Sequence, residues 1–86
     1  MVNRTKDEIF MDEAIQLAES VSLMGEIPVG ALVVLGGKVI GAAGNANIKN
    51  GDPTAHAEML AIKQASSHVG NYRLAGASLY LSLIHI

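Results

Sequence analysis

An imidazole and a carboxylate lie two residues apart in the segment D-P-T-A-H-A-E, which runs from Asp52 to Glu58. Such a pair could serve metal-assisted hydrolysis, which needs a nucleophile, a group that moves protons and a pocket that holds the substrate. A bound zinc ion supplies the nucleophile by lowering the pKa of its water toward neutrality, and a carboxylate beside that water can carry the proton. In such a site His56 would be a zinc ligand and Glu58 the proton shuttle.

The same two residues also have ordinary structural explanations. A lone histidine near a helix start is more often a surface or capping residue, and a glutamate in a first turn is favourable through the helix dipole. Residues two apart point to different faces of a regular helix, so His56 and Glu58 can act together only in the first turn, where both side chains lean toward the N-terminus. The tripeptide alone favours the structural interpretation, and the surrounding sequence must decide.

The segment follows a predicted helix and a predicted β-hairpin. Apolar residues three or four positions apart predict an amphipathic helix over residues 6–24, and Gly25 is expected to end it. Residues 29–35 and 38–42 are apolar runs separated by two glycines, which is typical of a hairpin. Residues 43–51 are rich in glycine and asparagine and predict a loop.

The segment itself is expected to open a second helix. Asp52 or Thr54 would cap this helix, which runs to about Ser67, and residues 77–83 predict a third strand. The helix is expected to pack through an apolar stripe with two flanking residues: Ala57, Leu60, Ala61 and Ala65, with Met59 and Ile62 to the side. The order of elements indicates an α/β domain in layers, in which the second helix returns the third strand parallel to an earlier one.

The length of the chain indicates one small domain, and its composition excludes several classes of protein. The chain has 86 residues and a formal net charge of -2, so charge gives no support to a basic nucleic-acid-binding surface. It contains no cysteine, which excludes disulfides and thiolate metal ligands within this sequence. No apolar stretch follows the polar N-terminus, so neither a signal peptide nor a membrane span is expected, and the predicted location is the cytoplasm.

Several motifs surround the segment in a fixed order. They are G-E-I-P-V-G-A at 25–31, G-A-A-G-N at 41–45, D-P-T-A-H-A-E at 52–58, N-Y-R-L at 71–74 and S-L-Y-L-S-L at 78–83. In order and spacing, from about Asp7 to Leu83, they resemble the bacterial tRNA-specific adenosine deaminases, which are cytidine-deaminase-like zinc enzymes. The resemblance implies an α/β, three-layer α/β/α fold, a Zn2+ cofactor, a homodimer, and conversion of adenosine to inosine at the wobble position of a tRNA anticodon loop.

The resemblance also assigns roles to individual residues. It implies that His56 is a zinc ligand and that Glu58 is the proton shuttle. Asn45, Ile27 and Ala55 correspond to positions that line the base pocket. Each of these three also has an ordinary explanation, as a turn residue, an apolar loop residue and a small residue at a helix start respectively.

The chain departs from the family pattern after Leu83. Members continue with E-P-C-x-x-C, which carries two cysteine ligands of the zinc ion, whereas this sequence has Ile84, His85 and Ile86. One imidazole does not hold zinc, because such sites take three or four protein ligands, and His85 is expected to be a bystander. The tail L-S-L-I-H-I is what the sequencing adapter CTGTCTCTTATACACATC encodes. Residues 1–86 are therefore expected to be a single incomplete and inactive deaminase domain, with an adapter-derived tail at residues 81–86.

Two alternatives remain open. A deaminase of free guanine or cytosine is one, since relatives of that kind also carry D-P-T-A-H-A-E, although G-E-I-P-V-G and N-Y-R-L favour the tRNA enzyme. The other is a non-catalytic deaminase-like partner protein that has lost its metal site. Retention of both His56 and Glu58 argues against that second alternative, because a scaffold has no use for a proton shuttle.

Overall fold

The structure is a computed structural model, and it describes residues 5–52, 55–70 and 74–83. The elements in chain order are α1 (Lys6–Ser22), β1 (Val29–Leu35), β2 (Lys38–Gly44), α2 (Asn47–Asn50), α3 (Ala57–Val69) and β3 (Ser78–Leu83). None of the helices in these ranges has the length and apolar character needed to cross a membrane. The predicted order of helix, strand, strand, helix and strand is confirmed, with α2 as an addition.

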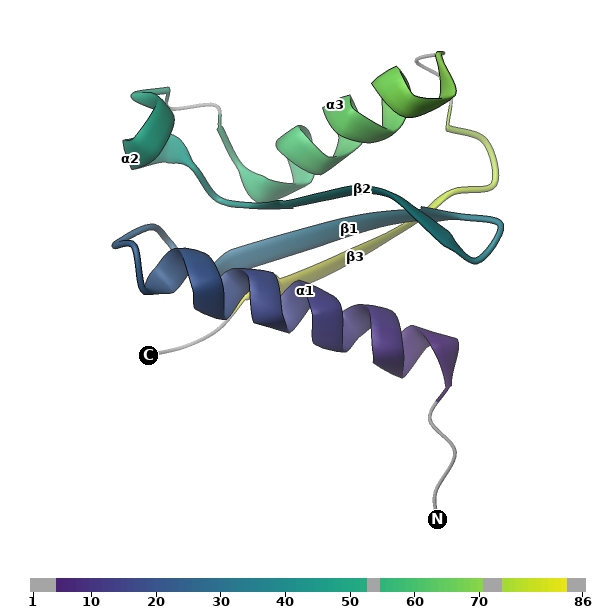
Figure 1. Cartoon of the computed structure of the whole chain (residues 1–86), viewed down its shortest axis with the longest axis horizontal. Coiled ribbons are helices and arrows are strands. Elements are labelled where there is room, and N and C mark those ends of the chain that lie inside the picture. Colours follow the sequence, from purple (N-terminus) through teal and green to yellow (C-terminus); the bar gives the residue numbers. More distant parts are fainter. Residues whose placement is uncertain (1–4, 53–54, 71–73, 84–86) are drawn as a thin grey trace.

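The three strands form one antiparallel sheet in the order β2-β1-β3 (Figure 1). The hairpin pairs Leu35 with Lys38 at its turn, as the sequence predicts. The third strand runs in the direction of the earlier strand β2, as expected, but it does not pair with β2: β1 lies between the two strands and pairs antiparallel with both. The crossover through α3 therefore skips one strand position.

The sheet lies between two helices, which gives the predicted three-layer α/β/α arrangement (Figure 1). Helix α1 packs on one face around Ala14, Leu32 and Val34, and α3 packs on the other around a second core cluster. Both helices approach the sheet closely at a glycine. A Cβ at Gly30 would collide with the backbone of α1, and a Cβ at Gly41 would collide with the backbone of α3.

A shift in register helps α3 to pack on β2. Val33 pairs with Gly41 and Val34 pairs with Val39, so the strand accommodates Ile40 as one extra residue. Ile40 is buried in the same core cluster as the alanines of α3. The apolar stripe predicted for this helix is confirmed at Ala57, Ala61 and Ala65, which are fully buried. Leu60 is half-buried, and the two residues predicted to flank the stripe, Met59 and Ile62, are exposed.

Several element boundaries differ from the prediction. Helix α1 ends at Ser22 rather than Met24, because Leu23 forms its C-cap. The predicted loop over residues 43–51 contains the end of β2 and the one-turn helix α2. Helix α3 begins at Ala57, so Asp52 does not cap it; Thr54 and the motif residues Asn71–Arg73 lie outside the described residues, as do Ile84, His85 and Ile86.

Candidate active site

The first turn of α3 brings His56 and Glu58 together at one end of the sheet. His56 is the N-cap residue, with φ −81° and ψ 148°, and its side chain makes no capping hydrogen bond. Its ring is exposed, whereas Glu58 is half-buried. Ala57 between them is fully buried and anchors the turn in the core. The geometry confirms that the pair shares a first turn, which is the only arrangement in which the two side chains can act together.

Asn45 connects the end of β2 to this turn. Asn45 is only 3% exposed, and its Oδ1 accepts a hydrogen bond of 2.8 Å from the Ala57 backbone N–H. Its own backbone N–H donates to the Val29 carbonyl at 3.1 Å. The amide of Asn45 thus takes the place of a side-chain cap for α3, which leaves the His56 imidazole available.

Ala55 is buried directly before the turn. Its carbonyl accepts a hydrogen bond of 2.9 Å from the Ala46 N–H, next to Asn45. This bond keeps the backbone of Ala55 outside the helix, which explains why α3 starts later than the sequence predicts. Ala55, Asn45, His56 and Glu58 are therefore neighbours through the backbone of β2 and α3.

Ile27 lies in the loop between α1 and β1. Ile27 is 55% exposed, and its carbonyl accepts a hydrogen bond of 2.8 Å from the Val29 N–H. Among the described residues, no hydrogen bond joins Ile27 to His56 or Glu58. Its neighbour Glu26, which the sequence did not single out, is buried and accepts two backbone hydrogen bonds from α2.

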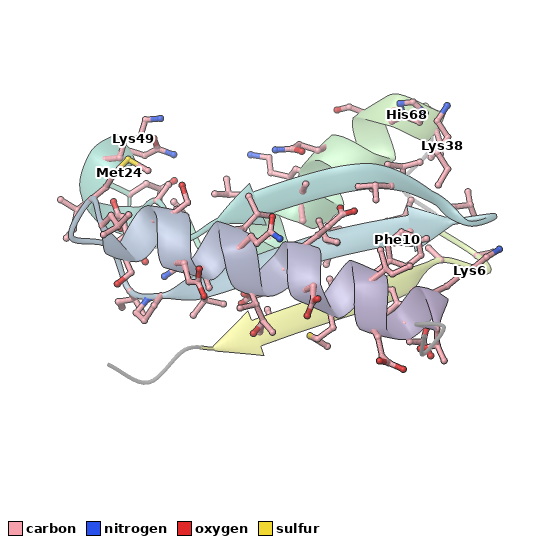
Figure 2. The ribbon with its side chains drawn as sticks, turned by 60° about the horizontal axis from the view of Figure 1, so that its bottom comes forward. Lys6, Phe10, Met24, Lys38, Lys49 and His68 are labelled. Atoms are coloured by element: carbon pink, nitrogen blue, oxygen red, sulfur yellow. The ribbon has the colours of Figure 1, made fainter. Side chains whose placement is uncertain are left out.

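A cavity of about 380 Å³ opens at the same end of the molecule. It lies between the end of α1, the end of β2 and α2, and it is lined by Val21, Met24, Glu26, Gly44, Asn45, Ala46, Ile48 and Lys49. Figure 2 shows Met24 and Lys49 together at this end. Neither His56 nor Glu58 is among the residues that line the cavity, whereas Asn45 both lines it and bonds to Ala57 between them.

The described residues do not form a zinc site by themselves. No group of three or more histidine, aspartate or glutamate side chains able to hold a metal occurs within residues 5–52, 55–70 and 74–83, and the sequence has no cysteine. His56 offers one imidazole, whereas zinc sites use three or four protein ligands. His56 therefore supplies only one of the ligands that a zinc site needs.

Known proteins share this arrangement of elements. The chain matches the family model of the cytidine and deoxycytidylate deaminase zinc-binding region over residues 4–84. It is 43% identical over 79 residues to the tRNA-specific adenosine deaminase of Bacillus subtilis, a match that covers 92% of this chain and 49% of that protein. The chain thus spans about half the length of the curated relatives it matches.

Two solved structures superpose closely on it. One comes from a study of A-to-I editing by tRNA:A34 deaminases at the wobble position of transfer RNA, with a TM-score of 0.87 and 40% identity over 91% of this chain and 60% of that one. The other is a guanine deaminase from Bacillus subtilis, with a TM-score of 0.83 and 36% identity over 94% of this chain and 50% of that one.

Proposed function

Because the chain belongs to the cytidine and deoxycytidylate deaminase zinc-binding family, we propose that it is part of an enzyme that hydrolytically deaminates adenosine to inosine at the wobble position of tRNA. The observation that carries the proposal is the first turn of α3, where an unused imidazole and a half-buried carboxylate flank a buried alanine. Similarity to tRNA-specific adenosine deaminases supports the choice of base and of RNA.

Each residue of the turn has a proposed role. His56 is one ligand of a zinc ion whose other ligands are not among the described residues. That ion, when bound, supplies a water that is acidic enough to attack the base at neutral pH. Glu58 accepts a proton near the attacked carbon and returns it to the leaving amine. Asn45 and Ala55 line the base pocket next to this turn. Ile27 borders the base from the loop between α1 and β1.

The partners follow from the same proposal. A wobble adenosine must be turned out of its loop to reach such a turn, so the substrate is the anticodon loop rather than a stacked duplex. We place the enzyme in the cytoplasm with its tRNA, and we propose that it acts as a homodimer. Sedimentation of the complete enzyme would test the dimer.

Guanine deamination is the second candidate, because a guanine deaminase superposes almost as well as the tRNA enzyme. A free base needs no RNA-binding surface, and it would bind at the same site beside the first turn of α3. The two functions differ in substrate and not in the roles of His56 and Glu58. Only a direct comparison of substrates separates them.

The test uses a chimera, in which residues 1–83 of this chain are joined to the part of the Bacillus subtilis relative that follows the corresponding strand. We expect the chimera to bind zinc and to form inosine in an anticodon stem-loop, with little turnover of free guanine or cytosine. Inosine is measured by chromatography of the digested RNA. Efficient guanine turnover with an inert stem-loop would overturn the assignment of substrate.

Glu58→Ala in the chimera tests the chemistry. Zinc content should stay unchanged while turnover falls by about a thousandfold or more, because general acid–base catalysis contributes about 10²–10⁴. Glu19→Ala serves as the control, since Glu19 is exposed on α1. Retention of activity in Glu58→Ala would refute the role of the carboxylate.

A further inference from the structure

Glu26 caps helix α2 from a distant part of the chain. Glu26 is only 7% exposed, and its carboxylate accepts hydrogen bonds from the N–H groups of Ile48 at 3.2 Å and Lys49 at 2.7 Å. These are the second and third amides of α2, the ones that an N-cap side chain usually satisfies. The N-cap residue of α2 is Ala46, which makes no side-chain capping bond. Glu26 supplies the missing acceptor.

Asn47 is the first residue of helix α2, so the conformation of the helix fixes its position. A helix of four residues is a single turn and is not stable alone, so its conformation depends on such external bonds. The Asn47 side chain accepts a hydrogen bond of 2.9 Å from Asn45 Nδ2, and its own Nδ2 donates to the Asp52 carbonyl at 2.9 Å. Asn47 therefore links the end of β2 to the start of the D-P-T-A-H-A-E segment.

Asn45 completes the connection to α3. The Ala57 N–H is the first amide of that helix, and no carbonyl within the helix can accept it. Asn45 Oδ1 accepts it instead. The orientation of this amide is fixed on its other side by Asn47. A series of hydrogen bonds thus leads from a buried carboxylate to the turn that carries the catalytic pair.

We propose that Glu26 is a positioning residue for the candidate active site. By capping α2 it fixes Asn47, and Asn47 orients the amide of Asn45. The amide of Asn45 then holds the first turn of α3, which carries His56 and Glu58. The catalytic consequence rests on the proposed function, but the mechanical coupling does not, and the two can be measured separately.

Amide hydrogen exchange in the chimera measures the coupling directly. Protection of the Ala57 N–H reports on Asn45, because the helix itself cannot protect that amide. In Glu26→Ala we expect protection of Ile48 and Lys49 to fall by about tenfold, as for the loss of one hydrogen bond each. We expect Ala57 to lose protection too, by about threefold or more. Glu19→Ala is the matched control and should change none of these amides.

Two further variants keep the result interpretable. Asn47→Ala should lower protection of Ala57 while leaving the amides that bind Glu26 less affected, and Glu26→Gln should restore part of the loss because it keeps one acceptor oxygen. The cavity beside Glu26 gives water access to the freed amides, so the fold should persist. The amide of Leu32 in the core serves as the measure of global stability.

The outcomes separate a positioning residue from a local cap. Loss of protection at Ile48 and Lys49 with Ala57 unchanged would overturn the proposal, as would an equal fall at Leu32. Kinetics then test the catalytic consequence in the chimera: Glu26→Ala should lower kcat by about tenfold with KM and zinc content little changed. If the chimera lacks deaminase activity, the proposed function fails, yet the exchange result still stands.

Discussion

At the scale of single residues, the site depends on side chains that cap helices remote from them in the sequence. The motif predicts His56 and Glu58, because their spacing is local and their chemistry is recognisable. The capping by Asn45 could not be predicted, since its partner Ala57 lies 12 residues away. Glu26 reaches its partners across 22 and 23 residues. Such caps leave no local pattern of the kind that a capping box does.

Asn45 offers a prediction at this scale. Asn45→Ala in the chimera removes the acceptor of a buried N–H and should lower the free energy of unfolding by about 1–3 kcal/mol. Asn45→Asp retains an acceptor for the Ala57 N–H but loses the donor to Asn47, so its cost should be smaller. Urea denaturation followed by circular dichroism measures both. Equal costs for the two variants would contradict the capping role.

At the scale of elements, the apolar patterns predict the helices and strands, but not how the strands pair. The stripe of small residues on α3 is visible in the sequence because it repeats every four residues, and it is buried as expected. The antiparallel pairing of β3 with β1 is set by long-range packing, which no local pattern reports. Helix α2 is missed because one turn with two asparagines has little intrinsic helix propensity.

Close packing of α3 on β2 gives the second prediction. An added Cβ at Gly41 would meet the Ala61 carbonyl oxygen and lie 3.1 Å from the Ala65 backbone nitrogen, neither of which can move without shifting the helix. Gly41→Ala should therefore destabilise the chimera by about 3 kcal/mol or more. Gly76→Ala is the control: it meets only Leu35 Cδ1 at 3.8 Å, but its φ of +81° should cost about 1 kcal/mol. Similar costs in thermal or urea unfolding would contradict the packing argument.

The contact between α1 and β3 gives a prediction on pH. The Tyr80 hydroxyl donates a hydrogen bond to Asp7 Oδ1, and this bond, followed by burial and the charge of Asp7, raises the pKa of Tyr80 above 10.0. A raised pKa means that the stabilising effect is fully present below pH 10 and is lost as pH rises through the folded-state value. Tyr80→Phe should thus make the free energy of unfolding fall less steeply as pH rises into the alkaline range. Unfolding of the chimera measured from pH 8 to pH 11 checks this, with Asp7→Asn expected to lower the pKa of Tyr80 in a spectrophotometric titration.

At the scale of the whole molecule, the zinc ion needs more than the described residues provide. Among residues 5–52, 55–70 and 74–83, His56 belongs to no group of three possible metal ligands, so the 86-residue chain should retain no stoichiometric zinc after gel filtration, whereas the chimera should retain about one ion per chain. A chelator should lower the Tm of the chimera and leave that of the chain unchanged. Elemental analysis and thermal scans measure both. Stoichiometric zinc in the chain alone would show that other donors complete the site.

The sheet presents an uncovered apolar surface on β3. Leu79 and Leu81 are each 46% exposed, and they pair with Val33 and Ala31, whose side chains belong to the core beneath α3. That helix packs over β1 and β2, and its Gln64 side chain accepts a hydrogen bond of 3.0 Å from the Ala42 N–H on β2. In the described sheet β3 is an outer strand. Its apolar side chains and its free edge are features that promote edge-to-edge association.

We therefore expect the 86-residue chain to self-associate with rising concentration, as measured by light scattering after gel filtration. Replacing Leu79 and Leu81 together by lysine should suppress this association, because charge on an outer strand disfavours pairing with a second chain. Leu23→Lys is the control, since Leu23 is 90% exposed but lies outside the sheet. If the control suppresses association equally, the cause is apolar exposure in general rather than β3. In the chimera the added segment should cover the same two leucines, so the double lysine variant should there lower stability by about 2 kcal/mol or more.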